Sequence, residues 1–151
     1  MSDRCLLRDR LYEMRTLPLS ESREKECFVL LIEEQAELRE LHMVALELEG
    51  YRPIAVPRGS DALNWLCMVL PSGIAPVAII LDHMVLRGNE AGGYIRQRLK
   101  DLFTDWEISL PPLILITPHC RHPDPNVLGV QDILSQPFPL KRLTGAINRL
   151  S

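Results

Sequence analysis

Short apolar runs alternate along the chain with longer segments in which apolar residues recur every three or four positions. The runs predict five β-strands, at residues 28–32, 54–56, 77–81, 113–116 and 133–134. The periodic segments predict about five amphipathic helices, because this spacing places apolar side chains on one helical face. Alternating strands and helices are typical of a parallel sheet with helices packed on both faces. The sequence therefore predicts an α/β fold with a doubly wound, five-stranded parallel sheet.

Individual residues refine the first part of this prediction. The run at 28–32 is wholly apolar, as expected for a central strand that is buried on both faces. Pro53 lacks a backbone N–H, so it predicts an edge position for the strand at 54–56. The helix between these strands is predicted to bury the stripe Leu38, Leu41, Ala45 and Leu48. Gly50 follows this stripe where a C-terminal cap is expected.

An N-terminal extension, residues 1–26, precedes the predicted domain at 27–151. Three apolar residues of the extension have helical spacing, Leu7, Leu11 and Met14. They predict a short amphipathic helix, and the polar residues 18–26 predict a linker after it. A stripe this short is not stable alone and is suited to docking on its own domain or on a second copy of the chain. A homodimer is therefore one expected assembly.

Composition excludes several classes of function. The 151 residues include 17 basic and 20 acidic side chains, for a net charge of -3, so we expect no direct binding to nucleic acid. The longest apolar stretch, 74–81, is far shorter than the roughly 20 residues that cross a bilayer, so no membrane span is expected. The N-terminal residues do not resemble a signal peptide, which predicts a cytoplasmic protein. The four cysteines are scattered, and we expect them to be reduced and mostly buried.

Polar residues directly follow the predicted strands. They are Glu33 and Glu34, Asp82, Thr117 and Gln136. Because the carboxyl ends of parallel strands converge on one crevice, we expect these side chains to be neighbours. Clustered carboxylates repel one another unless a cation lies among them, and their hard oxygen ligands suit Mg²⁺. The sequence therefore predicts a metal-dependent phosphate site at this edge of the sheet.

Five segments share a pattern with one known family. They are FVLLIEEQAELREL, GYRPIAVPRGSDALNWL, IILDHM, LILITP and GVQDILSQPFPLKRL. In this order they resemble the first strand with its acidic pair, the following GY...A..G.EAL stretch, the phosphoacceptor strand, the strand with the hydroxyl residue, and the GADDYLVKPF.LEEL ending of the receiver domain of two-component response regulators. The resemblance covers roughly residues 28–150 and implies the flavodoxin-like topology of CheY-like proteins.

The resemblance also implies a site and a function. Asp82 would be the phosphoacceptor, and Glu33, Glu34, Asp82 and the Met84 carbonyl would surround Mg²⁺. Thr117 would bind a phosphoryl oxygen. The chain would then be a stand-alone receiver-like domain in a two-component phosphorelay, a phosphoprotein that takes its phosphoryl group from a histidine kinase and modulates a protein partner. It would not be an enzyme beyond phosphorylation and dephosphorylation of its own Asp82.

The chain departs from the family pattern at several positions. Gln136 stands where the family has lysine, and Ile133 stands where its switch aromatic residue lies. Leu86 replaces the usual proline after the phosphoacceptor, and three prolines within 118–125 predict a shortened or irregular fourth helix. These departures support a second hypothesis, in which the chain is a pseudo-receiver. Such a module is not phosphorylated and signals by binding another signalling protein.

Other interpretations of these residues remain open. Glu33 is equally compatible with a solvated helix start, and Gln136 with shaping the turn before Pro137. A phosphatase of the haloacid dehalogenase type is disfavoured, because Met84 and Leu86 occupy the second Asp and the Thr of its DxDxT motif. A flavin-binding relative of the same topology is disfavoured because carboxylates follow the first strand and would repel phosphate.

Overall fold

A computed structural model describes residues 27–82, 91–117, 129–136 and 138–150 of the chain. The predicted N-terminal helix and linker, the carbonyl of Met84 and the predicted irregular fourth helix lie outside these residues. So do Cys5 and Cys120.

The core of the fold is a parallel sheet of five short strands, as predicted. Its strands are β1 (Phe28–Ile32), β2 (Arg52–Val56), β3 (Ala78–Asp82), β4 (Leu113–Thr117) and β5 (Asp132–Ser135). Their spatial order is β2-β1-β3-β4-β5, and every neighbouring pair is parallel. This order is the flavodoxin-like topology. The edge position predicted for the strand that contains Pro53 is confirmed, because β2 lies at the end of the sheet.

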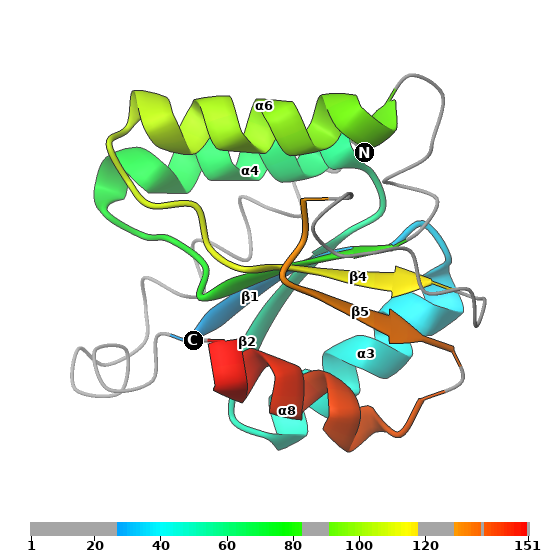
Figure 1. Ribbon diagram of the computed structural model, residues 1–151. Coiled ribbons are helices and arrows are strands. Elements are labelled where there is room, and N and C mark those ends of the chain that lie inside the picture. The colour runs from blue at the N-terminus through cyan, green and yellow to red at the C-terminus, as the bar shows by residue number, and fades with distance from the viewer. Residues whose placement is uncertain (1–26, 83–90, 118–128, 137, 151) are drawn as a thin grey trace.

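Helices cover both faces of the sheet (Figure 1). The helices α4 (Gly59–Val69) and α6 (Ala91–Asp105) lie over one face, and α3 (Ala36–Leu48) and α8 (Leu140–Leu150) lie over the other. A short 3-10 helix, η1 (Leu70–Ser72), extends α4. Among the residues that the structure describes, no helix is long and apolar enough to span a membrane.

The central strands are buried on both faces because their side chains alternate between two apolar layers. In β1, Leu30 and Ile32 join the layer under α4 and α6, whereas Val29 and Leu31 join the layer under α3 and α8. Every residue of β1, β3 and β4 is buried. For β1 this confirms the prediction made from its wholly apolar sequence. Trp65, on α4, is fully buried in the first layer.

The predicted stripe on α3 is partly wrong. Ala45 is buried as predicted, but Leu41 and Leu48 are exposed, and Met43 and Leu46 pack against the sheet in their place. The reason is that α3 carries apolar residues on more than one face, so helical spacing alone does not decide which face is buried. The predicted cap is confirmed at the end of the helix. Gly50 has a φ of 90°, and its N–H donates to the Glu47 carbonyl at 3.0 Å.

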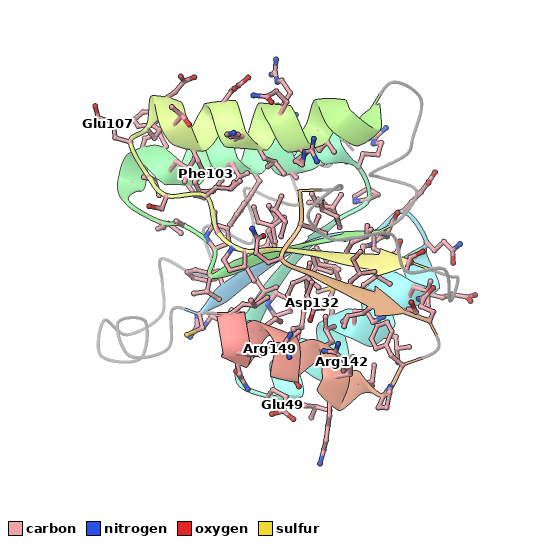
Figure 2. All side chains as sticks on the ribbon, in the orientation of Figure 1. Glu49, Phe103, Glu107, Asp132, Arg142 and Arg149 are labelled. Carbon is pink, nitrogen blue, oxygen red and sulfur yellow. The ribbon has the colours of Figure 1, made fainter. Side chains whose placement is uncertain are left out.

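The last strand and the last helix are joined by ion pairs (Figure 2). Asp132, on β5, accepts hydrogen bonds from Arg149 at 2.5 Å and from Arg142 at 3.4 Å, both on α8. The same carboxylate also accepts the backbone N–H of Ile133 at 2.8 Å. These contacts fix α8 against the sheet next to the segment that carries Gln136.

The two described cysteines, Cys27 and Cys67, are free, but both are exposed. The expectation of burial is wrong for them, because Cys27 precedes the buried strand β1 and Cys67 lies on the outward side of α4.

Candidate functional site

The predicted site residues lie at the carboxyl edge of the sheet. Glu33 follows β1, Asp82 ends β3, Thr117 ends β4 and Gln136 follows β5. These four strands are consecutive neighbours in the sheet, so their ends meet along one edge (Figure 1). The chain leaves β1 for β2 on one side and reaches β3 on the other side, which makes the β1–β3 junction the switch point where ligands bind in open α/β sheets. Glu33 and Asp82 stand at this junction.

Two buried carboxyl groups meet at the junction. The exposed fraction is 3% for Glu33 and 6% for Asp82, and a hydrogen bond joins their side chains. Burial raises the pKa of Glu33 from 4.5 to about 8, with further contributions from the hydrogen bond to Asp82 and from the charge of Asp82. Glu33 therefore carries a proton at neutral pH when no cation is bound. The solvated helix start that the sequence left open for Glu33 is wrong.

Backbone groups around the first strand end hold this pair in place. The Glu34 N–H donates to Oδ2 of Asp82 at 2.8 Å, and the Glu33 N–H donates to the Val56 carbonyl at 3.0 Å. The Gln35 N–H donates to Oε2 of Glu33 at 3.5 Å. The chain is thus tied to β2 on one side and to β3 on the other, which turns the Glu33 side chain inward. Glu34 is exposed and meets Asp82 through its backbone.

Arg39 also shapes the site, although the sequence pattern did not single it out. Its Nη1 donates to the carbonyl oxygens of Glu33 at 2.9 Å and Glu34 at 3.4 Å. These carbonyls precede α3, and Arg39 reaches back to them from the first turns of that helix. The available signal was a cation about one and a half helical turns after an acidic pair, which is too common to be specific.

Thr117 and Gln136 lie on the other side of Asp82. Asp82 is the register partner of Ile116, which places Thr117 at the next position along β4. Thr117 is buried, and its carbonyl accepts the N–H of Gln136 at 2.7 Å. The end of β5 is therefore fixed to the end of β4. The structure brings these two residues to the same edge as Glu33 and Asp82.

The donor set suits a small hard cation. Two carboxylates in contact need a positive charge between them, which either a proton or a divalent ion can supply. Mg²⁺ is usually held by one or two protein carboxylates together with water and phosphate oxygens, and Glu33 and Asp82 provide two. Among the residues that the structure describes, no three His, Cys, Asp or Glu side chains form a group that could hold a metal. Any cation here would therefore rely on this pair and on ligands from outside these residues.

Comparison with known proteins rests on structure. No family model matches the chain, and no curated protein matches its sequence. A response regulator receiver protein from Burkholderia phymatum matches with a TM-score of 0.64 and 22% identity, over 82% of this chain and 96% of that one. One from Sinorhizobium medicae WSM419 matches with a TM-score of 0.62 and 22% identity, over 82% and 92%.

The chemotaxis protein CheY4 of Vibrio cholerae is similar as well, with a TM-score of 0.61 and 17% identity, over 83% of this chain and 98% of that one. The fold is thus a flavodoxin-like, doubly wound α/β sheet. More narrowly, it is the fold of response regulator receiver domains, as the sequence resemblance predicted.

Proposed function

We propose that this chain is a receiver-like signalling domain that accepts a phosphoryl group on Asp82 from a histidine kinase and thereby changes its binding to a protein partner. The observation that carries the proposal is the contact between Glu33 and Asp82, which lies at the β1–β3 switch point of a receiver fold. Two carboxylates are rarely buried side by side, because each ionised group loses its hydration on burial. A buried pair at the ligand-binding edge is better explained by a role in binding a cation and a phosphoryl group.

The chemistry of the transfer follows from the position of Asp82. A carboxylate oxygen of Asp82 attacks the phosphorus of a phosphohistidine, and an O–P bond forms as the N–P bond breaks. The imidazole nitrogen leaves with the electron pair of that bond. The Glu34 N–H holds Oδ2 of Asp82 and so orients the attacking carboxylate. The hydroxyl of Thr117 donates to a phosphoryl oxygen.

A bound cation would be held by the carboxylates of Glu33 and Asp82. Mg²⁺ would offset the negative charge on the phosphoryl group during transfer. Glu33 would have to give up its proton to hold the cation, because a carboxylate coordinates metal in its ionised form. Cation binding is therefore coupled to proton release from Glu33, and it should strengthen as the pH rises toward 8.

A second candidate function is supported by Gln136. A glutamine side chain donates hydrogen bonds but carries no charge, so it pairs less strongly with a phosphorylated aspartate than lysine does. Hydrogen bonds to charged groups contribute about 1.5 to 3 kcal/mol. Without the lysine charge, the equilibrium constant for this contact in the phosphorylated state would fall roughly tenfold or more. The protonated Glu33 also allows the carboxyl pair to persist without a cation. In this alternative the chain is a pseudo-receiver that signals by protein binding alone.

Intact-protein mass spectrometry separates the two functions. The full chain is incubated with acetyl phosphate, once with Mg²⁺ and once with a chelator, alongside the variants Asp82→Asn and Asp101→Asn. Asp101 is a matched control, because it is exposed on α6, away from the candidate site, and its side chain accepts a hydrogen bond from Gln97 of the same helix. We expect a phosphoryl adduct with Mg²⁺ in the native chain and in Asp101→Asn, and none in Asp82→Asn. Absence of the adduct from the native chain overturns the phosphoacceptor function and leaves the pseudo-receiver.

A substitution at Gln136 tests whether this position contacts the phosphoryl group on Asp82. Gln136→Lys restores the charge at the end of β5. If Asp82 is a working acceptor, the lifetime of the phosphoryl adduct in Gln136→Lys should differ about tenfold from its lifetime in the native chain, because the lysine pairs directly with the phosphoryl group. An unchanged lifetime would show that this position does not contact the phosphoryl group.

A further inference from the structure

The outward face of α3 carries an apolar stripe. Leu41, Val44 and Leu48 have exposed fractions of 48%, 45% and 80%, and their spacing of three and four residues places them on one side of the helix. They make up three of the five large hydrophobic residues that are exposed in the described part of the chain. The opposite side of α3 packs on the sheet through Met43 and Leu46. We call Leu41, Val44 and Leu48 the outer stripe of α3.

Acidic side chains border the outer stripe. Glu37 lies one turn before Leu41 on the same side of the helix, and Glu40 and Glu47 lie together along one flank. All three are exposed. The only basic residue of α3 is Arg39, which reaches away toward the carbonyls of Glu33 and Glu34. The surface is therefore apolar along its centre and negative along one side.

The N-terminal extension has the complementary pattern. Its apolar residues Leu7, Leu11 and Met14 repeat at helical spacing, with the same overall length as the outer stripe. On a helix, three arginines fall together along one flank of this stripe: Arg4, Arg8 and Arg15. A helix over residues 3–15 would be about 20 Å long, the length expected for the 13 residues of α3. The two apolar stripes thus match in spacing and length, and the two charged flanks have opposite signs.

The extension joins the domain close to this surface. The carbonyl of Cys27 accepts the N–H of Arg52 at 3.0 Å, and the N–H of Tyr51 donates to the Leu46 carbonyl at 3.0 Å. Cys27 therefore lies beside the turn that joins α3 to β2. The intervening residues 16–26 can span up to about 36 Å when extended and about 17 to 20 Å as a flexible coil. This reach covers the full length of α3.

We infer that residues 3–15 form an amphipathic helix that docks on the outer stripe of α3 in the same chain. Leu7, Leu11 and Met14 pack on the outer stripe, and the arginine flank faces Glu40 and Glu47. The extension of the same chain is favoured over that of a second copy, because a short tether gives an effective concentration on the order of millimolar. The contact does not depend on phosphorylation. It lies along the helix whose first turns frame the candidate site.

Photocrosslinking in the full chain tests this contact. The photoreactive residue benzoylphenylalanine is placed at position 48, where an apolar side chain is already present and exposed. A second variant carries benzoylphenylalanine at position 106 instead. Trp106 is exposed beyond the end of α6, on the other side of the sheet. After irradiation of dilute protein, we expect a crosslink from position 48 to the peptide of residues 5–15 within one chain. We expect no such crosslink from position 106.

Two substitutions in the extension make the test specific. Leu11→Glu places a charge in the centre of its apolar stripe, and it should lower the crosslink yield from position 48 about tenfold. Leu6→Glu is the matched control, because Leu6 lies off the stripe, and its crosslink yield should stay unchanged. The inference is overturned if no crosslink to the extension forms, if Leu11→Glu leaves its yield unchanged, or if the crosslink joins two chains and grows with protein concentration.

Discussion

The proton on Glu33 makes the stability of the protein depend on pH in a way that one substitution should remove. The pKa of this carboxyl group is raised from 4.5 to about 8 by burial and by Asp82. Between these two values the folded state binds one more proton at Glu33 than the unfolded state does. The contribution of Glu33 to the free energy of unfolding is therefore complete below pH 4.5, falls as the pH rises, and is lost above pH 8.

The substitution Glu33→Gln keeps a neutral hydrogen-bond donor next to Asp82 but removes the ionisable group. In metal-free buffer, the variant and the native chain should have similar free energies of unfolding near pH 4.5. The variant should then become progressively more stable than the native chain up to pH 8. The full shift corresponds to an upper limit of about 5 kcal/mol at the alkaline end, since each pKa unit corresponds to about 1.4 kcal/mol.

Urea unfolding at several pH values between 4.5 and 8.5 measures this difference. Glu37→Gln is the control, because Glu37 is exposed in the first turn of α3, and its effect should stay within about 0.5 kcal/mol at every pH. Titration of groups that are distant from Glu33 cancels when each variant is compared with the native chain at the same pH. A difference between Glu33→Gln and the native chain that is flat with pH, or that shrinks as the pH rises, would refute the buried, protonated state of Glu33.

Two further predictions concern the side of the sheet covered by α3 and α8. His42 is buried and stacks on Phe138 with ring centroids 5.8 Å apart, and burial lowers its pKa below 6.5, so stability is complete above pH 6.5 and falls below it. His42→Phe should therefore raise the melting temperature more at pH 5 than at pH 8, and calorimetry that finds equal shifts at both pH values would contradict this. Asp132→Asn weakens the ion pairs with Arg142 and Arg149, and urea unfolding should show a loss of about 1 kcal/mol at low ionic strength. The loss should shrink at about 1 M salt, whereas a loss independent of salt would contradict its assignment to the ion pairs, since Asn keeps the oxygen that accepts the Ile133 N–H.

Local pattern in the sequence determined the order and type of the elements. A wholly apolar run such as Phe28–Ile32 can only be satisfied by a strand that is covered on both faces, and Pro53 can only be tolerated at an edge. The positions of Glu33, Asp82 and Thr117 at strand ends follow directly from these strand boundaries. Parallel strands then bring their ends to one edge whatever the details of packing are.

Contacts between distant parts of the chain decided the rest. Glu33 and Glu34 are adjacent and chemically alike, yet only Glu33 is buried, because its N–H bonds to Val56 on β2 and the next N–H bonds to Asp82, 48 residues away. The pKa of Glu33 is raised only in the folded chain, where Glu33 is buried against Asp82. Likewise, α3 has apolar residues on more than one face, and its packing on the sheet selected Leu46 and left Leu48 in solvent. Sequence periodicity sets which residues share a face, whereas burial depends on what the folded chain places opposite that face.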